Sequence, residues 1–218
     1  MPIRLPDETK RLAIVGATGS GKTIAELWHL SMRDYDSRPW IIYNFKDDEN
    51  IDSIPYAQPM AIDEMPTKPG IYIVKPLPGQ KDELEAQMWE VWRRGGIGVA
   101  IDEGYMIGTR NEAFRALLTQ GRSKRIPMIV LSQRPVWMDK FVFTESEFIQ
   151  VFRLQHSDDN KTVEKFVPAN LNEKRLPDFH SYYYDVGRDK VSVLSPVPEM
   201  DVINRSFAAR LSRLKRTV

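Results

Sequence analysis

The sequence contains no cysteine, which excludes disulfide bonds, a thiol nucleophile and a cysteine-ligated zinc site. It also lacks any uncharged apolar run near the ~18 residues that a membrane-spanning helix needs, because its longest candidates have the length of a strand. The first residues are polar and include two prolines, unlike a secretion signal. We therefore expect no membrane span and a cytoplasmic location.

Neither sign of charge is in excess, because 31 Lys and Arg residues face 30 Asp and Glu residues, a net charge of +1. A nucleic-acid partner would therefore have to be bound by local basic patches. The hydrophobic share of 42% and charged share of 28% are typical of soluble globular proteins and exclude a disordered or fibrous chain. A length of 218 residues favours a single domain over residues 1–218.

The chain has no internal repeat, and its 15 prolines separate short periodic blocks. The apolar runs that predict strands lie at 11–15, 40–45, 70–75, 97–102, 126–132 and 148–154. The segments with helical periodicity lie at 22–33, 81–94 and after Asn111, which we expect to be an N-cap. This alternation predicts an α/β fold with a mainly parallel sheet flanked by helices. Residues 47–69 are expected to be an irregular connection with one short helical turn.

The last third of the chain has different patterns. Ser157 is expected to cap a helix that runs to about Val167 and stops at Pro168. Residues 182–194 place Gly187 between two β-rich runs and predict a hairpin. Residues 204–218 carry five Lys or Arg side chains and no acid, and predict a basic terminal helix. We divide the domain into a core of about 11–155 and a C-terminal extension of about 156–218.

Residues 16–23 read GATGSGKT and match G-x-x-x-x-G-K-[ST] between a predicted strand and a predicted helix. The glycines let successive N–H groups converge on phosphate oxygens at the positive end of the helix. The residues expected to bind a nucleoside triphosphate are Gly16, Ala17, Thr18, Gly19, Ser20, Gly21, Lys22 and Thr23. Lys22 would neutralise the β and γ phosphates, and the Thr23 hydroxyl would ligate Mg²⁺. The alternative is a chance glycine-rich turn.

Two acids, Asp102 and Glu103, end the predicted strand 97–102. Asp102 is expected to hold the Mg²⁺ through its water shell. Glu103 points elsewhere and could orient, or accept a proton from, an attacking water, which predicts hydrolysis. The alternative is an ordinary acidic turn after a strand.

Gln133 follows the next buried strand, whose last side chain reaches the carboxyl edge of the sheet, where open α/β sheets bind ligands. Its amide is a candidate sensor of the γ-phosphate, and a polar strand end is the alternative. Before this strand, residues 122–125 carry three cations beside Gly121. This turn is either a solvated basic turn or an arginine finger given to a neighbouring subunit, and we favour Arg122 over Arg125.

In this order, these motifs resemble the FtsK-HerA superfamily of DNA-pumping ATPases, especially the genome-packaging ATPases of tailless, internal-membrane icosahedral phages. The likeness covers about residues 11–155 and rests on the glycine loop, residues 44–48, VAIDE at 99–103, QGR at 120–122 and LSQRP at 131–135. The last two motifs are the more specific. One departure is Asn44, where members often carry an acid, and another is the absence of the extra domains of cell-division translocases.

The resemblance implies a RecA-like P-loop NTPase fold of the ASCE class, with ATP and Mg²⁺ as cofactors. It also implies a homo-oligomeric ring, a pentamer or a hexamer, with ATP between subunits and double-stranded DNA through the centre. A viral packaging motor would work in the host cytoplasm or on the virion and could meet a capsid portal or vertex protein. Basic side chains such as Arg93, Arg94 and Arg110 could grip DNA phosphates, or could be solvated surface charges.

Three other functions remain open at this stage. A small-molecule kinase can have a P-loop and a similar length, but Glu103 beside Asp102 and a sensor-like Gln133 disfavour it. A Zot-like assembly ATPase of filamentous phages shares the core and usually adds a membrane segment. A nucleotide-dependent adaptor would bind ATP and scarcely hydrolyse it.

Overall fold

The computed structural model describes residues 3–171 and 176–217, with side chains described as far as residue 214. Its strands form one nine-stranded sheet in the order β3-β4-β2-β5-β6-β1-β7-β8-β9. The strands are β1 (Leu12–Val15), β2 (Pro39–Asn44), β3 (Gln58–Pro59), β4 (Gly70–Val74), β5 (Gly98–Asp102), β6 (Met128–Ser132), β7 (Phe148–Val151), β8 (Ser181–Asp185) and β9 (Lys190–Leu194). The pairings from β3 to β7 are parallel, and β8 and β9 continue the sheet as an antiparallel hairpin.

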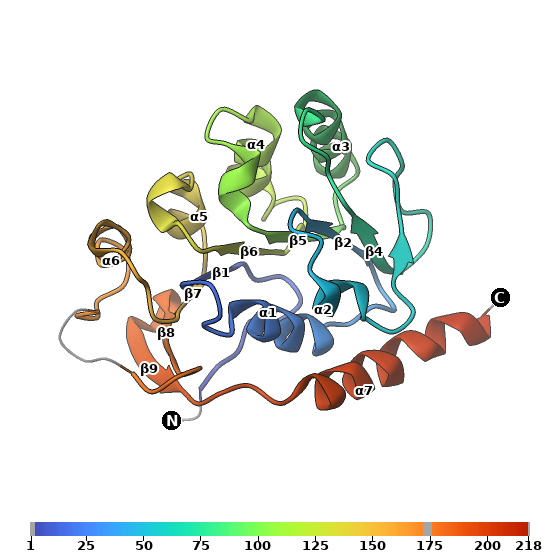
Figure 1. The fold of residues 1–218 in the computed structure, drawn as a ribbon. Coiled ribbons are helices and arrows are strands. Elements are labelled where there is room, and N and C mark those ends of the chain that lie inside the picture. Colours follow the sequence, from blue (N-terminus) through green and yellow to red (C-terminus); the bar gives the residue numbers. More distant parts are fainter. Residues whose placement is uncertain (1–2, 172–175, 218) are drawn as a thin grey trace.

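Helices cover both faces of the sheet, α3 to α6 on one and α1, α2 and α7 on the other (Figure 1). Their bounds are α1 (Lys22–Ser31), α2 (Glu49–Asp52), α3 (Lys81–Arg94), α4 (Glu112–Gln120), α5 (Phe141–Thr144), α6 (Ser157–Val163) and α7 (Met200–Leu211). Short 3-10 turns are η1 (Gly104–Ile107), η2 (Pro135–Trp137), η3 (Val186–Arg188) and η4 (Ser212–Thr217). Within the described residues, no helix is long and apolar enough to span a bilayer.

The core has two layers because the central strands are covered on both faces. In β1, Ala13 and Val15 pack in the layer under α3 and α4, whereas Leu12 and Ile14 pack in the layer against α1 and α7. Every residue of β1, β4, β5, β6 and β7 is buried. This double burial explains why these strands are continuous apolar runs in the sequence.

The strand order brings the ends of β1, β5 and β6 together at one edge. Strand β6 lies between β1 and β5, and Val15 at the end of β1 pairs with Ser132 at the end of β6. Parallel strands present their carboxyl ends at the same edge of a sheet, so the loops that follow these three strands are neighbours. The fold class predicted from the sequence is confirmed, including the parallel core and the terminal hairpin.

Three local expectations are wrong. Residues 47–69 hold not only the short helix α2 but also β3, which pairs with β4 at Tyr72 and Ile73. Ser157 does not cap α6, because His156 already has extended backbone angles and Ser157 is the first helical residue. That helix ends at Val163 rather than near Val167.

The basic terminal helix differs from the expected one mainly in its bounds. Helix α7 begins at Met200, includes Asp201 and gives way to the η4 turn after Leu211. The predicted helix ran to residue 218. That residue, and the side chains from 215 onward, lie outside the part of the chain that the structure describes. The extension beyond residue 156 supplies β8 and β9 to the common sheet. The single-domain interpretation and its division near residue 156 stay predictions.

Candidate active site

The glycine loop links the end of β1 to the start of α1 and is held close to the end of β6 and to the segment that follows β7. The Gly16 N–H donates to the Ser132 carbonyl (3.2 Å), and the Ala17 N–H donates to the Arg153 carbonyl (2.8 Å). A Cβ atom at Gly16 would lie 2.6 Å from the Phe152 Cβ, so a larger residue would force these segments apart.

The loop then turns into the helix at Gly21, which has a φ of 98°, a left-handed conformation that favours glycine. Among the described residues, no side chain caps α1. The first-turn N–H groups of the helix therefore remain available to an anion, and the positive end of the helix dipole favours it.

Lys22 and Glu103 meet in the interior beside this loop. The Lys22 Nζ lies 3.7 Å from the Glu103 Oε1, and the Lys46 Nζ lies 2.5 Å from the same oxygen. The Glu103 side chain is fully buried, whereas that of Lys46 is 36% exposed. Burial lowers the pKa of Lys22, and the Glu103 charge opposes this effect. Lys22 and Lys46 thus compensate the charge of the buried Glu103 carboxylate, the group expected to orient the attacking water or to accept its proton.

Gln133 connects this carboxylate to the glycine loop. Its backbone N–H donates to the Glu103 Oε2 (3.0 Å), and its side-chain Oε1 accepts from the Thr18 hydroxyl (2.6 Å). Its Nε2 donates to the Tyr105 hydroxyl (3.3 Å). The structure therefore brings together Lys22, Glu103 and Gln133, three of the four side chains expected to be catalytic.

Asp102 ends β5 and is 2% exposed. Its Oδ2 has no hydrogen-bond partner among the residues described. Burial, and next the Glu103 charge, raise the pKa of the Asp102 carboxyl to about 6. A buried oxygen without a partner is unusual in a folded protein and fits a group that serves a bound cation.

The Thr23 hydroxyl lies in the first turn of α1, as expected for a magnesium ligand. In the described part of the chain, no three His, Asp or Glu side chains gather as a metal cluster.

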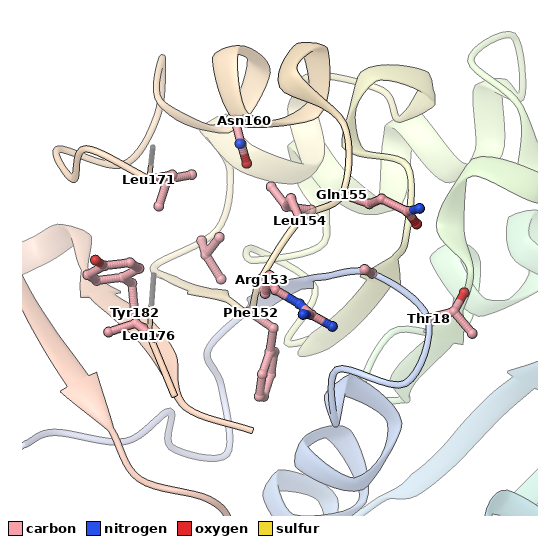
Figure 2. Close-up of a pocket in the computed structure, with 11 residues that line it drawn as sticks. Thr18, Phe152, Arg153, Leu154, Gln155, Asn160, Leu171, Leu176 and Tyr182 are labelled. Carbon is pink, nitrogen blue, oxygen red and sulfur yellow. The ribbon is translucent and has the colours of Figure 1, made fainter. Parts of the chain in front are cut away.

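A pocket of about 540 Å³ opens beside the glycine loop (Figure 2). Its walls come from the loop, from the segment after β7, and from α6 and β8, and include Thr18, Phe152, Arg153, Leu154, Gln155, Asn160 and Tyr182. Its lining combines apolar side chains with amides and one guanidinium. This pocket was not predicted from the sequence, because its walls come from segments that are far apart in the chain.

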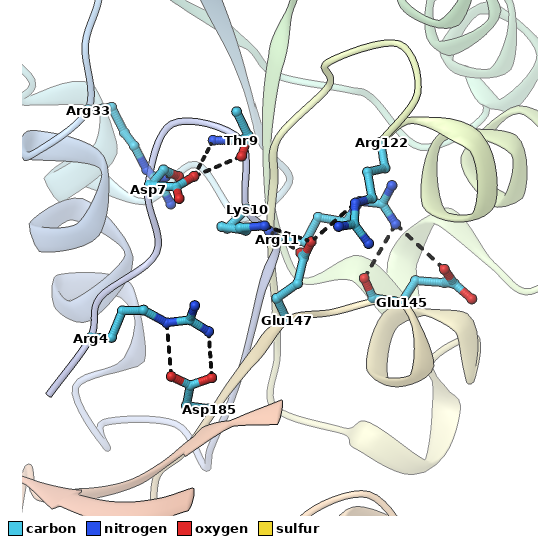
Figure 3. Close-up of polar contacts among 10 residues, drawn as sticks. All are labelled: Arg4, Asp7, Thr9, Lys10, Arg11, Arg33, Arg122, Glu145, Glu147 and Asp185. Carbon is cyan, nitrogen blue, oxygen red and sulfur yellow. Dashed lines mark hydrogen bonds and ion pairs between the residues drawn. The ribbon is translucent and has the colours of Figure 1, made fainter. Parts of the chain in front are cut away.

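Arg122, the fourth side chain expected to be catalytic, lies at the opposite edge of the sheet (Figure 3). It follows α4 and precedes β6, with its side chain 74% exposed and its Nε 3.9 Å from the Glu147 Oε1. The glycine loop follows the carboxyl end of β1, whereas Arg122 lies before the amino end of the adjacent β6. The structure does not bring Arg122 to the other three residues within this chain.

Sequence reasoning missed two charged residues of the site. Lys46 lies two residues beyond β2, and its contact with Glu103 arises only when β2 and β5 pair. Glu26 lies one turn into α1 and is 0% exposed. Burial raises the pKa of the Glu26 carboxyl well above its usual range. The available signal was its spacing of three residues from Thr23, which places both on one side of the helix.

Comparisons with known proteins show what this chain is similar to. No protein-family model matches the chain. The DNA packaging ATPase P9 of Enterobacteria phage PRD1 is 46% identical over 217 residues, which cover 95% of this chain and 96% of P9.

Two solved structures share the fold at low sequence identity. The genome packaging NTPase B204 of Sulfolobus turreted icosahedral virus 2, in complex with AMPPCP, matches with a TM-score of 0.70 and 17% identity. The match covers 88% of this chain and 100% of B204. EssC (ATPases 2 and 3) from Geobacillus thermodenitrificans matches with a TM-score of 0.61 and 10% identity, over 97% of this chain and 45% of that one. The identity and coverage of the P9 match show that this chain belongs to the family of phage DNA packaging ATPases within the FtsK-HerA superfamily.

Proposed function

We propose that this chain is an ATP-hydrolysing motor that packages double-stranded DNA into a viral capsid. The observation that carries the proposal is the meeting of Lys22, Glu103 and Gln133 beside the glycine loop. Its relative P9 is a DNA packaging ATPase of similar length. The phosphates of ATP would lie against the loop residues 16–23.

In this proposal the buried residues divide the hydrolysis between them. Lys22 neutralises the terminal phosphates, and Glu103 orients a water molecule and accepts its proton as the bond to the leaving ADP breaks. Gln133 contacts both Glu103 and Thr18, so a shift of its side chain when the γ-phosphate binds or leaves can change the position of the Glu103 carboxylate. Lys46 occupies the Glu103 Oε1 and must give way before that oxygen can accept a proton.

Mg²⁺ would be held by Thr23 and, through water, by Asp102, and would offset the negative charge of the phosphates. The unpartnered Oδ2 of Asp102 supports this assignment, within the residues described. The nucleoside would enter the pocket of Figure 2, where Asn160 and Gln155 supply amide groups and Phe152, Leu154 and Tyr182 supply apolar surface.

The ring and its DNA are also part of the proposal. Exposed Arg122 cannot serve the nucleotide of its own chain from the far edge of the sheet, but it can reach that of a neighbour in a pentameric or hexameric ring. This arrangement would let one subunit stabilise the transition state in the next. The motor would act in the host cytoplasm or on the virion, against a portal or vertex protein.

The test is ATP hydrolysis by the purified protein with and without double-stranded DNA. We expect Lys22→Ala to abolish nucleotide binding. We expect Glu103→Gln to retain binding and to lose hydrolysis by about 10²- to 10⁴-fold, because it removes the group that accepts the proton.

Glu49→Gln is the matched control, since it removes an exposed acid at the start of α2 and should keep the wild-type rate. Wild-type hydrolysis by Glu103→Gln in the presence of DNA would overturn the assignment.

A further inference from the structure

Glu26 is a buried acid that nothing in the described protein satisfies. Its side chain lies in the second turn of α1, the residue is 0% exposed, and both carboxyl oxygens lack a hydrogen-bond partner among the described residues. Buried polar groups are almost always hydrogen-bonded, and leaving one unpaired is unfavourable. Glu26 therefore lacks a partner among the described residues, and a bound ligand could supply one.

Helix geometry directs Glu26 toward the start of α1. Side chains in an α-helix lean toward its N-terminus, and residues three or four apart lie on one face. The Glu26 carboxyl therefore leans toward Lys22 and Thr23, the residues in the first turn. The charged groups that act on it most strongly are Asp102, Asp48 and Glu103, followed by Lys22. Glu26 and Asp102 thus face the same buried space between α1 and the end of β5, and each has an oxygen without a partner among the described residues.

We propose that Glu26 is a positioning residue for the nucleotide-bound divalent cation, accepting hydrogen bonds from its water ligands beside Asp102. The inference rests on the proposed function, because it requires a metal–nucleotide complex on the glycine loop. Mg²⁺ keeps several of its waters when it binds proteins, and those waters need acceptors. Carboxylates around the coordination shell that orient such ligands commonly set metal affinity. Glu26 has two carboxyl oxygens that have no partner among the described residues.

The first test measures binding of a non-hydrolysable ATP analogue with MgCl₂ and with EDTA, for the wild type and Glu26→Gln. Gln keeps the size of the side chain and replaces one carboxyl oxygen with an amide NH₂ group, which donates and cannot accept a hydrogen bond. We expect the gain in analogue affinity that Mg²⁺ confers to fall about 10- to 100-fold, with the affinity in EDTA unchanged. Glu49→Gln removes a nearby exposed acid and should keep the full gain.

The possible failures of this test are distinguishable. If the wild type itself gains nothing from Mg²⁺, then metal use in the proposed function is wrong and the inference falls with it. If the wild type gains and Glu26→Gln gains as much, only the role of Glu26 is overturned.

The second test measures the thermal stability of the nucleotide-free protein in EDTA. Glu26→Met replaces the unpaired oxygens with an apolar side chain of similar volume, so we expect the Tm to rise by about 2–6 °C. A residue that served only the fold would give the opposite sign. A lower Tm for Glu26→Met would mean that the carboxyl is satisfied within the free protein, and would overturn the inference.

Discussion

The two edges of the sheet differ in how their acidic side chains are partnered. At the amino edge, Glu147 accepts a hydrogen bond from the Arg11 N–H (2.9 Å) and also lies 3.7 Å from the Lys10 Nζ (Figure 3). At the carboxyl edge, Asp102 and Glu26 bury oxygens that lack partners within the described chain. At the amino edge the acid Glu147 therefore has partners within the fold, although the Nε and Nη2 atoms of Arg11 there lack hydrogen-bond partners among the described residues. At the carboxyl edge it is the acids themselves that lack partners, and in the proposed function a bound ligand would supply positive charge and hydrogen-bond donors.

This contrast distinguishes an acid that is partnered within the fold from acids that, in the proposed function, would interact with a bound ligand. The buried Arg11 donates to the Leu118 and Glu145 carbonyls, which ties the start of β1 to α4 and to the segment before β7. Arg122 is the exception at this edge, because its side chain is largely exposed and its contact with Glu147 is long. An exposed ion pair of this length contributes little stability, so Arg122 is free to act on another molecule.

The largest effect is expected for Arg122→Ala, which should reduce DNA-stimulated hydrolysis by about 10³-fold or more, as loss of an arginine finger does. Nucleotide affinity and Tm should stay near wild type, because the side chain is exposed. Mixing Arg122→Ala with Glu103→Gln subunits should recover activity at interfaces that combine one intact finger with one intact glutamate. Arg125→Gln, in the same turn, is the matched control. If assembled rings of the mixed subunits recovered no activity, Arg122 would be a solvated surface charge with no role in hydrolysis.

A smaller effect is expected for Gln133→Ala at the carboxyl edge. Because the amide contacts Thr18, its loss should reduce kcat by about 10²-fold, similar to the loss of one transition-state donor. The backbone N–H that reaches Glu103 remains, so that carboxylate should keep its place. Thr18→Val removes only the hydroxyl contact and should have a weaker effect. Steady-state kinetics measure both, and equal rates for wild type and Gln133→Ala would exclude the sensor role.

The smallest effect is a pH dependence of stability that comes from His29, which lies in the buried middle of the protein, away from both edges. Burial lowers the pKa of His29, which contacts the Gln150 Oε1 (2.9 Å), from 6.5 to about 3. Above pH 6.5 the ring is neutral whether the chain is folded or unfolded. Below it, only the unfolded chain takes up the proton, so the free energy of unfolding should fall by about 1.4 kcal/mol per pH unit until pH 3.

Urea unfolding at pH 7 and pH 5 measures this dependence. His29→Gln should lower the pH slope by one proton, and His156→Gln, at an exposed position, should leave it unchanged. An unchanged slope in His29→Gln would show that other groups cause the acid sensitivity.

Local signals predicted much of the fold. Helix α3 has the predicted bounds because its apolar period ends at Gly95, and Asn111 caps α4 by accepting from the Phe114 N–H (2.7 Å). Strand β3 could not be predicted, since it is two residues long and exists only through pairing with β4. The helix α1 shows the limit of periodicity. Ile24, Leu27, Trp28 and Met32 have helical spacing in the sequence, but only Leu27 of these four is fully buried.

The site divides in the same way. Motifs placed Lys22, Glu103 and Gln133, because each follows a strand whose end the parallel topology carries to one edge. Lys46 and Glu26 have no motif, and their roles depend on tertiary neighbours. Helix α1 lies between the sheet and α7, so it is covered on more than one side. Polar residues such as Glu26 are therefore buried, although an amphipathic pattern with one apolar face predicts that polar residues are exposed. The roles of the site residues stay predictions.

The position of β6 has a mechanical consequence. This strand is hydrogen-bonded along both sides, to β1 and to β5, and it carries Ser132 directly before Gln133. Sliding it would rupture two ladders at once, so the sheet behaves as a rigid frame. In the proposed motor, the movement that drives DNA forward would then arise in the loops that follow the strands or between whole subunits, and not within the sheet.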